Sequence, residues 1–480
     1  LVAVMFLAHF AKKGFRCAVR LEAFMAFLTA ILIIVNSICY GPMYANVSGF
    51  LNASKAEFSE ETIQQSKDTI EKVGEEGMVL VKNDGLLPLS SDVTNLNVFG
   101  WDSTCPIYGG TGSAGSHSDG NVSILQSLQD AGYKTNETLS NMYTEYCAER
   151  PTISMSAQDW SLPEPNMKHY TDDIMNEAKD FSDTAMVVLG RPGGEGADLP
   201  TNMSAVINGT YNQGLATSNA PANWRYMNAT YTNNGSYDDF EEGESYLEPS
   251  VTEEQLIEKV CSEFDNVIVV INANNTMELG WVDNYEQIKS VILAPGAGET
   301  GFTALGEILN GTVNPSGKTA DTYVKNLLST HYINNIGNFP YTNVDDLKAQ
   351  ALAADSSYKG NVSFVNYVEG IYVGYKFYET AAEEGLIDYE SSVQYPFGYG
   401  LSYTTFDKTM TNFKDNGDTV SFDVEVTNTG DVAGKDVVEV YYTPPYTNGG
   451  IEKASVNLVQ FEKTETLEPG KSQTLSFEIA

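Results

Sequence analysis

The 480-residue sequence predicts an α/β fold: a mainly parallel sheet flanked by helices, then a small all-β sandwich, preceded by an N-terminal transmembrane helix. Three observations predict this. Short continuous apolar runs alternate with amphipathic helical segments between residues 59 and 403, as in a sheet that is covered on both faces. From residue 404 to 480 the apolar period becomes two, which is typical of half-buried strands. An apolar run of bilayer-spanning length lies at 23–40.

Residues 1–45 are expected to form a cytoplasmic tail and a signal anchor. Four basic residues between positions 12 and 20 precede the apolar run, and the next positive charge is Lys55. The positive-inside rule therefore places the N-terminus in the cytoplasm and the remainder outside. A cleaved signal peptide is the alternative, although the run is longer than a usual signal core. The protein is accordingly expected to be membrane-anchored with extracytoplasmic domains, or secreted.

The α/β region begins with a helix that Ser59 can cap, and Gly74 and Gly77 are expected to punctuate it. Ser250 and Glu253 have the spacing of a capping box at the start of a later helix. Buried strands are expected at 78–81, 96–100, 184–190, 267–271 and 290–294. Ligands of parallel sheets bind beyond the carboxyl ends of the strands, and glycine-rich turns fall there in this sequence.

The formal net charge of −37 argues against nucleic acid as a partner, because a protein this acidic repels phosphate at long range. The five cysteines are scattered and never in a CxxC spacing, and the four histidines are equally dispersed. A disulfide scaffold and a metal cluster are therefore not expected. The polar segment 201–249 interrupts the helix and strand pattern and is either a surface loop or a lid over a site.

Two turns have the composition of candidate functional motifs. Residues 109–115 form a glycine-rich stretch without the lysine of a phosphate-binding loop. Residues 191–198 place Glu195 between glycines directly after a buried strand, where a carboxylate can act as a general acid. A tight turn with a solvated glutamate is the alternative interpretation of that second motif.

Six motifs in order give these turns a context: 76–89 with its Lys82-Asn83, the turn at 109–115, Gly194-Glu195-Gly196, Asn314-Pro-Ser-Gly-Lys318, 367–375 and 396–404. Together they resemble the family 3 glycoside hydrolases, the β-glucosidase and β-xylosidase family. The resemblance implies an α/β sandwich domain over 59–403 and a fibronectin type III-like domain over 404–480, which we expect to be incomplete. It also implies a catalytic (β/α)8 barrel following residue 480 in a longer reading frame.

The resemblance implies a retaining mechanism with two carboxylates. Glu195 matches the acid/base glutamate, and no metal or organic cofactor is implied. The residues that we expect to contact the substrate are Asp198, Arg191, Lys82, Asn83, Gly110 and Gly112. For Lys82 and Asn83, capping and turn roles are an equal alternative. Leu199 departs from the family pattern, which usually has arginine there.

The expected function is hydrolysis of β-glucosidic bonds at non-reducing ends of short oligosaccharides. The Ser-Asp-Trp motif of the barrel nucleophile does not occur, and the nearest string, Gln158-Asp159-Trp160, lies in the sandwich domain. The alternative is a non-catalytic carbohydrate-binding or wall-associated module derived from the same family. The sequence indicates neither the oligomeric state nor the identity of the sugar.

Overall fold

The computed structural model describes residues 10, 12–41, 44, 48, 58–116, 120–147, 153, 158–195, 197, 199–211, 229–232, 239–335, 339–341, 343–356, 363–364 and 367–480. The chain divides into two compact units, 1–65 and 66–480. In the first unit, α2 (Arg16–Cys39) is a 24-residue helix without a buried side chain. It is long and apolar enough to cross a membrane, a test that an N-terminal signal sequence also passes.

The helix expected after Ser59 is α4 (Glu60–Gly77), and the Ser59 hydroxyl accepts from the Thr62 amide at 3.1 Å. The expectation that Gly74 punctuates this helix is wrong, because α4 continues through Gly74 to Gly77. A Cβ on Gly74 would lie 2.4 Å from the carbonyl oxygen of Gly301. Gly74 therefore permits a close backbone contact and does not end the helix.

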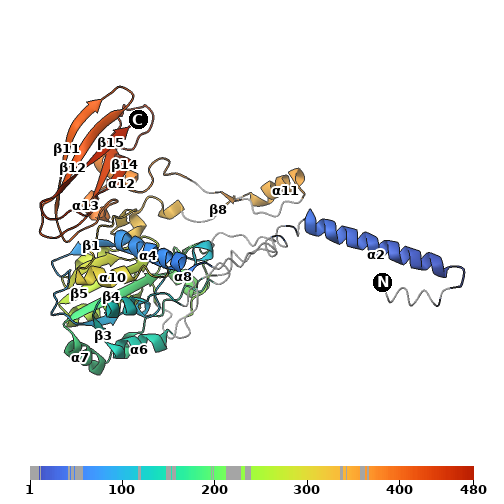
Figure 1. Ribbon diagram of the computed structural model, residues 1–480, viewed down its shortest axis with the longest axis horizontal. Coiled ribbons are helices and arrows are strands. Elements are labelled where there is room, and N and C mark those ends of the chain that lie inside the picture. Colours follow the sequence, from blue (N-terminus) through green and yellow to red (C-terminus); the bar gives the residue numbers. More distant parts are fainter. Residues whose placement is uncertain are drawn as a thin grey trace. The chain divides into compact units, whose positions relative to one another are not determined.

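A central sheet organises the second unit (Figure 1). Its six strands have the order β1-β6-β5-β4-β2-β3. All neighbours pair in parallel except β1, which pairs antiparallel with β6. The strands are β1 (Val79–Asn83), β2 (Asn95–Phe99), β3 (Lys134–Thr135), β4 (Thr184–Arg191), β5 (Asn266–Ala273) and β6 (Ile288–Leu293). The mainly parallel sheet predicted from the apolar runs is confirmed, and each of the five expected strands is present.

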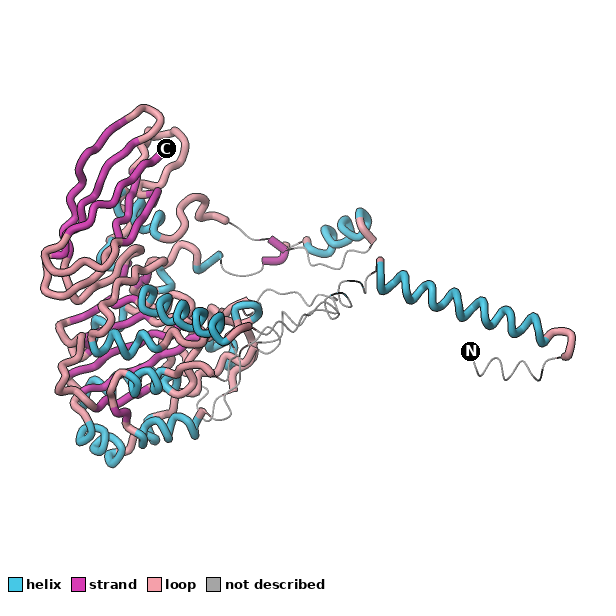
Figure 2. The backbone as a smooth tube through the Cα atoms, in the orientation of Figure 1, coloured by secondary structure: helices cyan, strands magenta, loops and turns pink. Residues whose placement is uncertain are grey.

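Alternate residues of the central strands enter two separate cores, one on each face of the sheet. Figure 2 shows helices around the strands of this sheet. In β4, Val187 joins one core and Val188 the other. Helices α6 (Glu137–Tyr146), α7 (Asp172–Phe181) and α9 (Val251–Glu263) cover the first face, and α5 (Ile124–Asp130) and α10 (Thr303–Asn310) cover the second. Burial on both faces explains why these strands are continuously apolar in sequence.

Shorter elements connect the sheet to the C-terminal domain. They are β7 (Tyr323–Val324), β8 (Phe339–Pro340), α11 (Val344–Ala354), β9 (Ser363–Phe364), α12 (Tyr375–Glu383), α13 (Tyr389–Ser392) and β10 (Val393–Tyr395). Helix α8 (Met203–Ile207) lies earlier in the chain, between β4 and α9. Strand β7 pairs with β10, and β8 pairs with β9.

The C-terminal domain consists of a three-stranded sheet, β11-β12-β15, and a two-stranded sheet, β13-β14. The strands are β11 (Phe406–Asp415), β12 (Val420–Asn428), β13 (Val437–Tyr442), β14 (Asn457–Lys463) and β15 (Ser472–Ile479). The predicted period of two is confirmed, because Val424, Val426, Leu475 and Phe477 are buried between neighbours that are half-buried or exposed. Strand β11 is exposed along almost its whole length, so it has no such pattern in the sequence.

Two of the sequence motifs join the α/β region to the β domain. The Asn314 side-chain oxygen accepts from the Tyr403 amide at 2.8 Å, and its nitrogen donates to the Ala433 carbonyl at 3.0 Å. Lys318 forms an ion pair with Asp436 at 3.4 Å. The motif at 314–318 therefore has a structural role between the two domains.

Candidate active site

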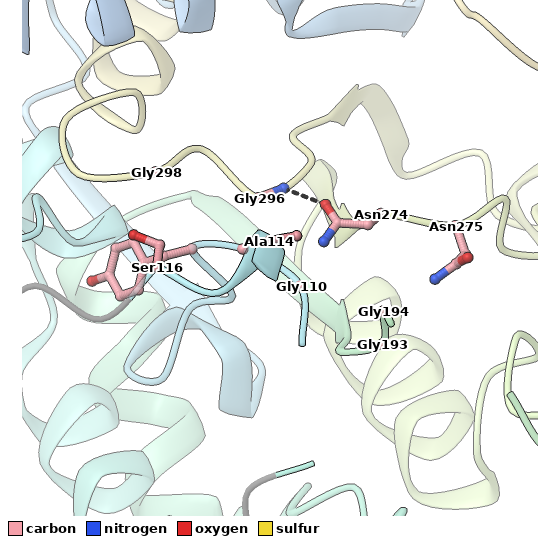
Figure 3. Close-up of a pocket in the computed structure, with 11 residues that line it drawn as sticks. Gly110, Ala114, Ser116, Gly193, Gly194, Asn274, Asn275, Gly296 and Gly298 are labelled. Atoms are coloured by element: carbon pink, nitrogen blue, oxygen red, sulfur yellow. Dashed lines mark hydrogen bonds between the residues drawn. The ribbon is translucent and has the colours of Figure 1, made fainter. Parts of the chain in front are cut away.

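Four turns that follow β2, β4, β5 and β6 meet at the carboxyl edge of the sheet, around a hollow of about 530 Å³ (Figure 3). Its lining residues are Tyr108, Gly109, Gly110, Ala114, Ser116, Gly193, Gly194, Asn274, Asn275, Gly296 and Gly298. This is the edge at which parallel α/β sheets bind ligands, as the sequence predicted from its glycine-rich turns.

The glycines of this edge let the turns pack backbone against backbone. The Thr111 amide donates to the Gly193 carbonyl at 3.1 Å. Gly194 has φ +145°, and a Cβ there would lie 2.4 Å from the Thr111 nitrogen. A Cβ on Gly110 would lie 3.1 Å from the Gly193 oxygen. The glycine-rich stretch at 109–115 is thus a packing surface for the turn that carries Glu195.

Glu195 is exposed at the tip of its turn, and its neighbours fix its orientation. Its Oε2 accepts from the Ser113 hydroxyl at 2.9 Å and from the Ser113 amide at 3.2 Å. Its backbone carbonyl accepts from the Thr111 hydroxyl at 2.6 Å. A Cβ on Gly112, which has φ +67°, would lie 2.5 Å from Oε2. Of the predicted residues, Glu195, Gly110 and Gly112 are therefore brought together.

A carboxyl group that is solvent-accessible, held at one oxygen and placed next to a hollow can give a proton to a bound ligand or take one from it. The two donors from Ser113 set the direction of the carboxyl plane. A general acid must lie within hydrogen-bonding distance of the atom that receives its proton, and a carboxyl with a fixed direction is favourably oriented for that transfer.

Arg191 does not reach the hollow, so its expected substrate contact is corrected. The side chain is 0 % exposed. Its guanidinium forms a bidentate pair with Glu253, at 2.8 and 2.5 Å, and also donates to the carbonyls of Gly190, Tyr246 and Glu248. Five hydrogen bonds use all five N–H donors of an arginine, which leaves none for a sugar hydroxyl.

Lys82 and Asn83 lie at the opposite edge of the sheet, so their expected substrate contacts are also corrected. Strand β1 is antiparallel, and Asn83 pairs with Ser290 near the start of β6, whereas the hollow lies beyond the end of β6. The Asn83 side chain makes two hydrogen bonds with the next turn. Its nitrogen donates to the Leu87 carbonyl at 2.8 Å, and its oxygen accepts from the Leu87 amide at 3.0 Å. Lys82 pairs with Asp84 at 3.6 Å. Both have the turn roles that were the alternative.

Three further residues were singled out in the sequence, and the structure describes two of them, Leu199 and Asp159. Asp198 lies outside the described residues. Leu199 is half-buried, and a Cβ on Gly193 would lie 3.1 Å from its methyl group, so Leu199 packs against the turn. Asp159 forms an isolated bridge with Thr230, and its carboxylate accepts from the Ser161 amide at 3.1 Å, as expected for a loop residue.

Two residues that were not expected from the sequence, Asn274 and Asn275, directly follow β5 and line the hollow. The Asn274 side-chain oxygen accepts from the Gly296 amide at 2.7 Å and so joins the turns after β5 and β6 (Figure 3). Their position immediately after a buried strand was the available signal, the same signal that identified Glu195.

Among the described residues, one group of carboxylates is close enough to share a cation: Glu71 and Glu75 on α4 and Glu307 on α10, with oxygens within 4.8 Å of one another. Burial and the neighbouring acids raise the pKa of Glu71 and of Glu307. None of the three lines the hollow. The sequence spacing could not indicate this group, because two of its members are more than 200 positions from the third.

A mainly parallel α/β sandwich with a carboxylate on a glycine turn, followed by a small β domain, is an arrangement found in glycoside hydrolases. Residues 78–403 match the glycosyl hydrolase family 3 C-terminal domain, and residues 436–480 match the fibronectin type III-like domain. The chain belongs to glycoside hydrolase family 3.

The chain is 29% identical to beta-glucosidase A of Butyrivibrio fibrisolvens over 429 residues and 30% identical to a beta-glucosidase of Ruminococcus albus over 412 residues. These matches cover 84% and 85% of this chain but 44% and 35% of the two relatives. Beta-glucosidase 3B of Thermotoga neapolitana, solved in complex with α-D-glucose, superposes with a TM-score of 0.62 at 26% identity. That match covers 87% of this chain and 49% of the solved one, so the chain spans less than half the length of these relatives.

Proposed function

We propose that this chain contributes the acid/base half of a β-glucosidase active site, which removes terminal β-linked glucose from short oligosaccharides. The observation that carries the proposal is the exposed Glu195 carboxyl, held by Ser113 at the carboxyl edge of the sheet. The relatives named above are beta-glucosidases, and one was solved with glucose, which supports glucose as the sugar.

In this proposal Glu195 protonates the glycosidic oxygen as the bond to the anomeric carbon breaks. It then removes a proton from the water that attacks the glycosyl intermediate. The second carboxylate, the nucleophile, belongs to the part of the relatives that this chain does not span. Retention of configuration requires the two carboxyl groups to lie about 5–5.5 Å apart. Asp198 and the backbone around Gly110 and Gly112 are proposed to contact the substrate.

Replacing Glu195 tests the proposal in the complete polypeptide that carries this sequence. Glu195→Gln preserves the shape and loses the transferable proton. We expect turnover of a β-glucoside with a poor leaving group to fall by about 100-fold or more. An activated aryl glucoside, which needs little protonation, should be partly spared. Glu286→Gln, at an exposed glutamate before β6, is the control and should keep both activities.

Unchanged turnover of both substrates in Glu195→Gln would remove Glu195 from the mechanism. Analysis of the product by NMR should show the β-anomer first if the reaction proceeds with retention.

A non-catalytic carbohydrate-binding module is the second candidate, favoured by Leu199 at the place where the family usually has arginine. It predicts that oligosaccharides bind at the hollow without being cleaved. Calorimetry with cellobiose, followed by chromatography of the same sample, separates the two candidates. Intact cellobiose after prolonged incubation with the complete polypeptide would favour the binding module.

We further propose that α2 anchors the protein in a membrane with the α/β region outside the cytoplasm. The length and apolar character of Arg16–Cys39 and the basic residues before it support this. Alkaline carbonate should leave the protein in the membrane fraction, and deletion of residues 16–39 should release it. Release of the intact protein by carbonate would contradict an anchor.

A further inference from the structure

We propose that Arg191, Glu253 and the main chain of residues 244–248 form a brace that positions the Glu195 turn for proton transfer. The inference rests on the acid/base role proposed for Glu195. It assigns positioning roles to residues that touch neither the hollow nor the substrate.

The brace begins at the last residue of β4, four positions before Glu195. The Arg191 guanidinium joins three stretches of chain: its own strand through Gly190, the 246–248 segment through two carbonyls, and helix α9 through Glu253. The guanidinium carbon of Arg191, Cζ, also lies 5.5 Å from the centre of the Tyr246 ring. Every donor is used, so the side chain can adopt no second arrangement without losing hydrogen bonds in a buried site.

The 244–248 segment closes the turn at both of its ends. The Tyr246 carbonyl accepts from Arg191 Nε at 2.7 Å, before the turn, and the Tyr246 amide donates to the Pro200 carbonyl at 3.0 Å, after it. The Glu244 carbonyl accepts from the Met203 amide at 2.7 Å. One short stretch of backbone therefore fixes the distance between the two ends of the turn. The described end of the 201–249 insertion is thus a support for the turn.

Glu253 is a fixed anchor for the arginine. It is the third residue of α9, and its Oε2 accepts from the Ser250 amide at 2.9 Å while the Ser250 hydroxyl accepts from the Glu253 amide at 3.2 Å. The capping box predicted from the sequence is confirmed, and the same carboxylate completes the arginine pair. Burial lowers the pKa of Arg191, but the charge and hydrogen bonds of Glu253, together with the nearby Tyr246 and Tyr231, outweigh burial and raise this pKa.

The exposed tip of the turn is bordered by Ala197, which is buried in the core, so the tip moves with the packed part of the turn. Gly194 and Glu195 are exposed, and Thr111 and Ser113 hold the tip by a few hydrogen bonds. An exposed tip that hydrogen bonds hold in one orientation is displaced when the buried base from which it projects shifts. A shift of about 1 Å in a reacting group is enough to cost about 100-fold in rate.

The test uses two glutamates of the same helix in the complete polypeptide. Glu253→Gln removes the charge that holds Arg191. Glu263→Gln is the matched control, because Glu263 pairs with Lys179 and Lys259 at the exposed end of α9 and does not contact the brace. A second variant, Arg191→Lys, keeps the charge and loses the fork of donors.

The first measurement is hydrogen exchange of the amides in residues 193–197, which does not depend on activity. We expect exchange to be about 10-fold faster in Glu253→Gln and in Arg191→Lys, with the control unchanged. Equal exchange in all variants would overturn the brace. If one of the variants fails to fold, the other supplies the result.

The second measurement is the ratio of turnover on poor and activated leaving groups. We expect both brace variants to lose about 10- to 100-fold on the poor leaving group and much less on the activated one. Equal losses on both substrates would mean that the pair is only structural and would overturn its positioning role. If Glu195→Gln itself shows no dependence on the leaving group, the proposed function fails, whereas hydrogen exchange still decides whether the brace orders the turn.

Discussion

The two edges of the central sheet carry similar residue types and do different work. At the carboxyl edge, Glu195 stands exposed on a glycine turn beside a hollow. At the amino edge, Lys82 and Asn83 end β1 beside Gly85. Their side chains bond to Asp84 and Leu87 of the turn that follows. Both stretches look like candidate sites in the sequence. The difference teaches that the direction of a strand decides which edge its last residues reach.

A buried carboxyl beneath the carboxyl edge gives the largest expected effect. Glu164 accepts from the Trp101 amide at 2.9 Å and from the Tyr170 hydroxyl, and burial raises its pKa to about 8. In the unfolded chain the Glu164 carboxyl loses its proton near pH 4.5, whereas in the folded chain it keeps the proton up to about pH 8. Stability should therefore fall as the pH rises through this window, by on the order of 4 kcal/mol in total.

Urea unfolding of the wild type and of Glu164→Gln between pH 4.5 and 8 measures this effect. Glutamine cannot ionise, so the variant should have a clearly smaller slope, and Glu286→Gln should retain the full slope. Part of the slope should remain in Glu164→Gln, because burial also raises the pKa of Glu278, to about 7. A wild-type slope that persists in Glu164→Gln would show that another group is responsible.

The second largest effect is expected from replacing a glycine at the carboxyl edge, with a glycine at the amino edge as the control. Gly194→Ala introduces a Cβ 2.4 Å from the Thr111 nitrogen and should reduce turnover of a poor β-glucoside about 100-fold by moving Glu195. Gly85→Ala is the control, because Gly85 also has a positive φ, +85°, but has nothing within 4 Å of the added Cβ. Equal activities in the two variants would show that the packing of the turns does not position Glu195.

Asn83→Ala should affect stability and leave activity alone. The side chain makes two hydrogen bonds with Leu87 and accepts from the Ser290 hydroxyl at 2.9 Å. Losing them should cost about 1–3 kcal/mol in the free energy of unfolding. Denaturant titration measures this, and an unchanged KM for the β-glucoside would confirm that the amino edge does not bind substrate.

Lys82→Gln should have the smallest effect. The pair with the exposed Asp84 spans 3.6 Å, and such pairs contribute about 0.5 kcal/mol or less. Denaturant titration should scarcely resolve the variant from wild type. A loss of sugar binding in Lys82→Gln would contradict the assignment of the two edges.

Much of the fold could be predicted, because a strand that is buried on both faces of a sheet is continuously apolar in sequence. Continuous apolar runs gave β4 and β5, and the period of two gave β12 and β15. Strand β11 left no mark, since its side chains are almost all exposed. The antiparallel direction of β1 left none either, because a buried strand has the same composition in both directions.

The sequence by itself determined the α/β order, the family motifs and the Ser250-Glu253 capping box, and it indicated Glu195 as a candidate. Each of these depends on residues close together in the chain. Only the tertiary structure decided the roles of Arg191, Asn83 and Asn274. A buried arginine and a substrate-binding arginine are identical in sequence. What separates them is whether distant carbonyls and a carboxylate already satisfy the donors, and that depends on contacts between residues far apart in the chain.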